Sequence, residues 1–190
     1  MKKFFGLSLL LAVLLSACKS DPKKEEIEVS DKAETSKEKM LQLNSATIQS
    51  NQFEVCKENE CPKVQLDYLV AIGENAEKIN EQNESYLIEI FNSTPDSTSV
   101  LTLEEAAEKF IEDYFKFKNE FPESPATYEA EISQEELVKN DSLLTYKTKF
   151  YLFTGGAHGY GATRFLNFNP KNGERLSNAD LFSDEKAFTD

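Results

Sequence analysis

The chain has 190 residues, of which 34 are Asp or Glu and 21 are Lys or Arg, so its formal net charge is −13 at pH 7. Contact with nucleic-acid phosphates needs a basic surface, and nucleic acid is therefore not expected as a partner. A basic protein partner fits the charge better, because opposite charges speed encounter, although solubility is the simpler interpretation.

Residues 1–17 predict an export signal. Lys2 and Lys3 give a positive start, residues 4–15 are mostly apolar, and small residues directly precede Cys18. The apolar run is too short to cross about 30 Å of membrane hydrocarbon. The ending resembles the bacterial lipobox, which implies cleavage before Cys18 and acylation of its thiol and new amino group. The alternative is an ordinary cleaved signal with an incidental cysteine.

Residues 18–44 are expected to form the lipidated cysteine and a disordered tether. Residues 19–39 alternate Lys, Glu, Asp and Ser and contain no aromatic residue, so they cannot bury enough apolar surface to fold. Several acyl chains would hold such a protein at a membrane almost irreversibly. The expected location is the cell envelope with the membrane as a partner through the lipid anchor. Lys19, in place of a retention aspartate, favours the outer membrane.

Cys56 and Cys61 predict one disulfide at the turn between two strands, at residues 47–55 and 64–72. The exported location permits a disulfide, and closing so short a loop stabilises by about 2 kcal/mol in the chain-entropy model. A zinc site is the rival interpretation, but two thiols without a second Cys or His pair lack the four ligands that zinc prefers. A redox pair is more usually spaced Cys-x-x-Cys.

Two amphipathic helices are expected next, separated by a loop at residues 92–99. Thr102 and Glu105 form a capping box before the second helix, and Pro122 ends it. The aromatic stripe on the second helix is interpreted as core rather than as a ligand cleft. The apolar face of the first helix comprises Ala76, Ile79, Tyr86, Leu87, Ile90 and Phe91, and that of the second comprises Leu103, Ala106, Ala107, Phe110, Ile111, Tyr114, Phe117 and Phe121.

The remainder is predicted to be β-rich. Strands are expected at residues 128–133, 143–153 and 163–168, with a turn at 139–141 and a short helical turn at 177–182. Asn172 and Gly173 are expected to supply positive φ angles in a hairpin turn. The predicted fold class is α+β, with antiparallel sheet segments packed against two amphipathic helices. Residues 45–122 form an N-terminal module, and 123–190 form a C-terminal module that is expected to be incomplete.

Residues 155–161 hold four glycines in seven positions, which permit unusual backbone angles and close approach. The spacing is not that of a dinucleotide fingerprint, and the loop enters a strand instead of a helix. A tight connection between strands is the favoured interpretation. The alternative is a recognition loop whose candidate ligand-binding residues are Gly155, Gly156, His158, Tyr160 and Arg164.

Catalysis has little support in the sequence. His158 is the only histidine, no Gly-x-Ser-x-Gly elbow occurs, and no His cluster offers three metal ligands, so neither a catalytic residue nor a cofactor or metal is predicted. A carboxylate pair of the glycosidase kind stays open.

The segment Phe-Tyr-Leu-Phe-Thr-Gly-Gly-Ala-His-Gly at residues 150–159 resembles the Y-x-x-G-G-A-H signature of the domain-of-unknown-function family 3298, and residues 167–169, 173–176 and 180–182 match its continuation. Residues 53–122 resemble family 4163, its usual N-terminal neighbour. Proteins with this resemblance include the extracellular part of a lysozyme-sensing anti-sigma factor and the non-catalytic part of a peptidoglycan deacetylase. The resemblance implies an envelope module that binds a lysozyme-like protein or wall glycan, and it transfers no activity.

The first functional hypothesis is therefore a non-catalytic binding module at the cell envelope, for a lysozyme-like protein or for peptidoglycan glycan. An enzyme that acts on wall material and a purely structural envelope lipoprotein are the alternatives.

Overall fold

The computed structural model describes residues 41–91, 102–184 and 187. The predicted export signal, Cys18, most of the expected tether and the loop at 92–99 lie outside the described residues. None of the helices in the described part is both long and apolar enough to cross a membrane.

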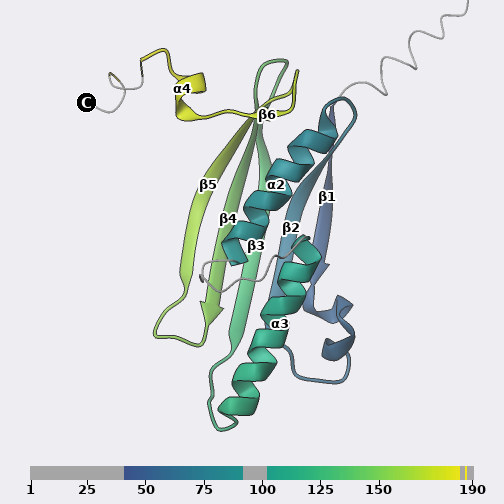
Figure 1. Ribbon diagram of the computed structural model, residues 1–190, viewed down its shortest axis with the longest axis vertical. Coiled ribbons are helices and arrows are strands. Elements are labelled where there is room, and N and C mark those ends of the chain that lie inside the picture. The colour runs from purple at the N-terminus through teal and green to yellow at the C-terminus, as the bar shows by residue number, and fades with distance from the viewer. Residues whose placement is uncertain (1–40, 92–101, 185–186, 188–190) are drawn as a thin grey trace, which may run out of the picture.

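The fold is mixed α+β and is built on one six-stranded sheet in the order β1-β2-β3-β4-β5-β6 (Figure 1). Neighbouring strands are antiparallel except β2 and β3, which pair in parallel over residues 63–67 and 129–133. The prediction of antiparallel segments is therefore corrected at this pair, where two helices form the crossover that parallel strands need. The strands are β1 Gln42–Gln49, β2 Lys63–Ile72, β3 Tyr128–Lys139, β4 Leu144–Thr154, β5 Tyr160–Asn169 and β6 Glu174–Arg175.

Helices α2 (Ala76–Phe91) and α3 (Leu103–Glu120) lie on one side of the sheet, and the short α4 (Asn178–Leu181) follows β6 (Figure 1). The capping box predicted at α3 is present: Glu105 N donates to Thr102 Oγ1 over 3.1 Å, and Thr102 N donates to the Glu105 carboxylate over 2.9 Å. These bonds satisfy backbone N–H groups that a helix start leaves without partners, so they fix where α3 begins.

The core divides into two apolar clusters. The first joins both helices to β2 and β3 through fully buried side chains such as Leu66, Ile111 and Ile132. The second lies under the start of α2 and includes Ile79, Tyr146 and Phe168, the last two from β4 and β5.

A buried polar network joins α2 to the sheet where β2 and β3 part. Their ladder ends at Asp67 and Ser133, and beyond it Leu69 N donates to Gln134 Oε1 over 3.1 Å. Gln134 Nε2 donates in turn to Asn83 Oδ1 over 2.8 Å and to Thr148 Oγ1 over 2.9 Å. A side-chain amide thus replaces a missing ladder bond, so the sheet can open without leaving buried backbone groups unpaired.

Several predicted boundaries are wrong. The first strand is Gln42–Gln49 rather than 47–55, and two 3-10 turns occupy residues 50–52 and 54–56. The Ser50 hydroxyl donates to Pro62 O over 2.6 Å and accepts from Val64 N over 2.7 Å, which turns the chain away from the strand. β5 begins at Tyr160, three residues earlier than expected.

Two smaller expectations also fail. Of the predicted positive-φ pair only Gly173 has a positive φ, at 70°, among the described residues; Asn172 does not. Phe121, expected in the core, is half exposed just beyond the end of α3, and Phe117 is only partly buried, whereas Phe110 and Tyr114 are buried.

Candidate functional site

The cysteine turn serves a structural purpose. Cys56 and Cys61 form the predicted disulfide, with a Cα–Cα distance of 5.3 Å. Both cysteines are half-buried and pack against the first apolar cluster. The bond therefore ties the short 3-10 turns to the start of β2.

The glycine-rich loop is explained largely by packing. The ring of Tyr151 covers Gly159 and Gly161: a Cβ on Gly159 would lie 2.4 Å from that ring, and one on Gly161 would lie 2.8 Å from the Phe150 carbonyl oxygen. Gly155 has φ +81°, and a Cβ there would lie 2.9 Å from that of Ala126. Within this loop Gly156 alone is free of such limits, since a Cβ added there would meet no atom within 4 Å.

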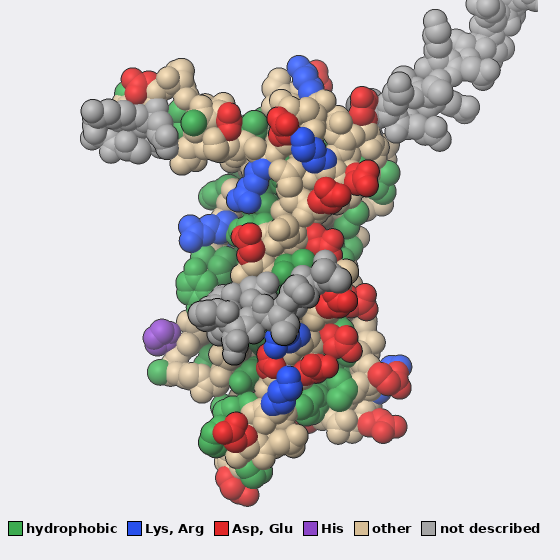
Figure 2. Space-filling model, viewed as in Figure 1, with side chains coloured by type: hydrophobic (Ala, Val, Ile, Leu, Met, Phe, Trp, Pro, Cys, Tyr) green, Lys and Arg blue, Asp and Glu red, His purple; other side chains and the backbone are tan. Residues whose placement is uncertain are grey.

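The predicted ligand residues divide into two groups. Gly156 and His158 are exposed in the loop, and the His158 ring nitrogen Nδ1 lies 3.4 Å from the Gly159 carbonyl oxygen. Figure 2 shows this imidazole, in purple, projecting from the edge of the molecule. Tyr160 and Arg164 lie on β5, which begins two residues after His158.

Tyr160 and Arg164 face the same side of the sheet as the helices. Side chains two apart along a strand share a face, and Leu166, next in that row, is buried in the second cluster together with residues of α2. The Tyr160 ring contacts that of Phe150 with centroids 5.5 Å apart, and 56% of the tyrosine is exposed. Arg164 is also exposed.

Two residues that the sequence does not single out complete this surface. Arg175 lies opposite Phe168 in the β5–β6 ladder, and its guanidinium carbon stands 5.6 Å from the centre of the Tyr86 ring on α2. Burial raises the pKa of the Tyr86 phenol, and the nearby guanidiniums of Arg164 and Arg175 oppose that rise. We call Tyr86, Tyr160, Arg164 and Arg175 the arginine face.

The surface charge around this face is uneven. Figure 2 shows Lys and Arg side chains over the β5 and β6 side of the upper half, while Asp and Glu dominate the β1 side. Arg164 and Arg175 are the only arginines of the chain. Within the described ranges neither has a carboxylate partner within 4.0 Å.

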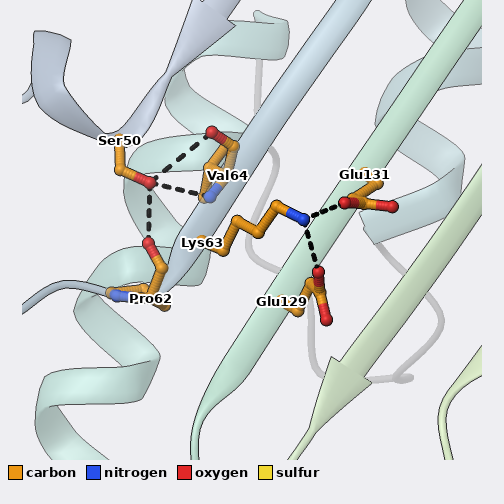
Figure 3. A network of polar contacts seen from close by, with 6 residues as sticks. All are labelled: Ser50, Pro62, Lys63, Val64, Glu129 and Glu131. Carbon is orange, nitrogen blue, oxygen red and sulfur yellow. Dashed lines mark hydrogen bonds and ion pairs between the residues drawn. The ribbon is translucent and has the colours of Figure 1, made fainter.

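The opposite face of the sheet carries charges that pair with one another. Lys63 on β2 contacts Glu131 and lies 2.8 Å from Glu129, both on β3, and these carboxylates raise the pKa of its ammonium (Figure 3). Lys147 and Glu135 are 2.6 Å apart. An open hollow of about 370 Å³ lies on this face, lined by Gln65, Asp67, Glu131, Ile132, Ser133, Lys149, Phe150 and Tyr151.

The described residues offer no specific group for acid–base or metal chemistry. The carboxyl groups with a resolved pKa shift in the described part, those of Asp113, Glu135 and Asp180, are all lowered, opposite to the direction of a general acid. No three His, Cys, Asp or Glu residues among those described gather as metal ligands would.

The sequence matches a known protein family. Residues 55–160 match the model of the family described as Deacetylase PdaC. The chain belongs to this family. The matched residues hold the disulfide, both long helices, Tyr86 and the glycine-rich loop except Gly161; Arg164 and Arg175 also lie beyond the match. No curated protein matches the sequence.

Solved structures similar to this PdaC-family chain include two DUF3298 family proteins. The one from Pseudomonas aeruginosa PAO1 has a TM-score of 0.54 and 20% identity, over 79% of this chain and 61% of its own. The one from Bacteroides fragilis has a TM-score of 0.53 and 19% identity, over 80% of this chain and 66% of its own. At these identities the likeness concerns the fold alone, and this chain spans just under two thirds of either structure.

Proposed function

We propose that this chain is an envelope lipoprotein, held by acylated Cys18, whose folded domain binds cell-wall peptidoglycan without acting on it. The resemblance of the sequence to the non-catalytic part of a peptidoglycan deacetylase supports a wall ligand, and the chain belongs to a family described as a deacetylase. The observation that carries the proposal is the arginine face, where an exposed tyrosine and two exposed arginines lie together on a strongly acidic chain.

This surface has the character of a carbohydrate–peptide binding site. Exposed Tyr160 offers an apolar ring, and Arg164 and Arg175 offer planar donors. In this proposal the two amphipathic helices pack against the sheet, and α2 forms one wall of the site because it brings Tyr86 beside β6. The tether then holds the domain clear of the lipid, within reach of the wall.

Sedimentation with purified, insoluble peptidoglycan tests the binding function. We expect the C18S chain, produced without residues 1–17, to sediment with peptidoglycan and to stay soluble with cellulose as a matched insoluble control. Equal amounts in the supernatant with and without peptidoglycan, at every salt concentration, would contradict the proposal.

The anchor is tested separately. Mass spectrometry of the native protein should find an amino terminus at Cys18 carrying acyl chains, and C18S should abolish this acylation. An uncut, unmodified amino terminus would rule out the lipoprotein assignment.

A cationic, lysozyme-like protein is the second candidate ligand. The net charge of −13 and the acidic β1 side of Figure 2 favour it, because complementary charge speeds association. Retention of the C18S chain on immobilised lysozyme at low salt, lost at high salt, is the expected result. Absence of retention at low salt would exclude this candidate.

A further inference from the structure

The two arginines of the chain come from two neighbouring strands of the sheet. Arg175 on β6 is paired with Phe168, and Arg164 lies four residues before Phe168 on β5, which corresponds to about 13 Å along the strand. Directly paired residues lie on the same face, and alternate residues of a strand do too, so both guanidiniums emerge on the α2 side of the sheet. The topology thus places both arginines on one surface.

Tyr86 provides a platform for one of them. The 5.6 Å separation between the Arg175 guanidinium carbon and the ring centre is within cation–π range. The backbone N–H of Arg175 also donates to Gln82 Oε1 over 3.0 Å, so α2 holds this residue at two points. A stacked guanidinium keeps its N–H groups directed outward, which prepares it to bind an anion.

Charge pairing distinguishes these residues from most of the lysines. Lys63, Lys78, Lys109, Lys116 and Lys147 each contact a carboxylate. Among the described residues, Glu89 is the carboxylate close enough to Tyr86 to raise the pKa of its phenol. Glu89 forms no ion pair with either arginine. Two arginines that share one surface and lack carboxylate partners within the described ranges, on an acidic chain, have the charge pattern of an anion site.

We propose that Arg164 and Arg175 bind carboxylate groups of the wall peptides, with Tyr86 as a positioning residue for Arg175. The inference rests on the proposed function for the source of the ligand. A planar guanidinium matches a carboxylate with two parallel hydrogen bonds, which an ammonium group cannot form. The domain therefore recognises the peptide part of peptidoglycan, and Tyr160 contacts the neighbouring sugar.

The test uses the C18S chain with a purified muropeptide that has free carboxylates, and with the same muropeptide after its carboxylates are converted to methylamides. Calorimetry should show that R164Q and R175Q each weaken binding of the free-carboxylate form by about tenfold, as expected for one charge-assisted hydrogen-bonded contact. R164K should lose affinity despite its retained charge. The double variant K149Q/K171Q removes as much charge as R164Q/R175Q from other surfaces and should bind as the parent does.

Variants of Tyr86 separate positioning from stability. Y86F keeps the ring and should keep the affinity, whereas Y86L should weaken binding. The double variant Y86L/R175Q should bind no more weakly than R175Q alone, because Tyr86 acts through Arg175. Thermal unfolding of every variant shows whether it folds. Equal affinity of R164Q/R175Q and the parent, or equal binding of both muropeptides, would overturn the site.

If neither muropeptide binds the parent, the proposed wall ligand fails, and the site is then tested by itself. Titration with succinate, followed through the NMR signals of the two arginine side chains, should shift both. Unshifted signals would overturn the carboxylate site.

Discussion

The hydroxyl of Tyr146 illustrates how a single group limits stability. The side chain is fully buried in the second apolar cluster, and its oxygen has no hydrogen-bond partner in the part of the chain that the structure describes. Burial raises the pKa of this phenol, so the group stays neutral, but it forfeits the hydrogen bonds that it makes with water in the unfolded chain.

Removal of that hydroxyl should therefore stabilise the fold. We expect Y146F to raise the free energy of unfolding by about 1 kcal/mol, measured by denaturant unfolding. T145S, at a neighbouring position, serves as the control for general disturbance of β4. A lower free energy for Y146F would show that the hydroxyl has a partner.

Two glycines of the glycine-rich loop test whether packing explains this segment. G161A should destabilise by about 1–3 kcal/mol, because the new methyl group would lie 2.8 Å from the backbone oxygen of Phe150. G156A meets nothing within 4 Å and should be neutral or stabilising by up to about 1 kcal/mol. Unfolding curves measured side by side decide between these outcomes, and equal losses for both variants would refute the packing explanation.

At the scale of elements, the start of α3 depends on local chemistry. T102A removes the acceptor of Glu105 N and should cost about 1 kcal/mol of stability. T102S retains an acceptor and should lose much less. Helical circular dichroism and denaturant midpoints of the two variants provide the measurement, and a T102A midpoint equal to that of T102S would contradict the cap.

The same local chemistry explains which elements the sequence predicts. The helices and the α3 cap are predicted from the spacing of residues only three or four apart. Together with the alternating apolar residues of the strands, they predict the α+β class. The end of β1 escapes prediction because Ser50 turns the chain through contacts with Pro62 and Val64. The stacking of Arg175 on Tyr86 likewise joins residues distant in sequence, so no local pattern indicates it. By contrast, the glycine-rich segment at 155–161 draws attention to residues 160 and 164 in the sequence alone, and their role in binding stays a prediction.

At the scale of the whole molecule, carboxylates link stability to pH. Burial alone would raise the pKa of Asp113, but hydrogen bonds from Lys109 and Lys116 lower it, and Lys147 lowers that of Glu135. A carboxyl with a lower pKa in the folded state contributes stability above its unfolded pKa, near 4, and loses it as the pH falls through the folded value.

We therefore expect the melting temperature to fall as the pH decreases below about 4, measured by thermal unfolding in low salt. D113N should show a shallower decrease over this range than the parent, because one linked group is removed. Identical pH profiles for the two proteins would contradict the assignment.

The parallel contact between β2 and β3 has a kinetic consequence. Short turns join β3 to β4 and β4 to β5, and residues 50–62 join β1 to β2, but residues 63–67 meet 129–133 only after the intervening chain closes a much longer loop. Contacts distant in sequence slow folding because loop entropy is lost before they form. The seam between the two halves of the sheet should therefore assemble last, so that core substitutions there accelerate unfolding far more than they retard refolding.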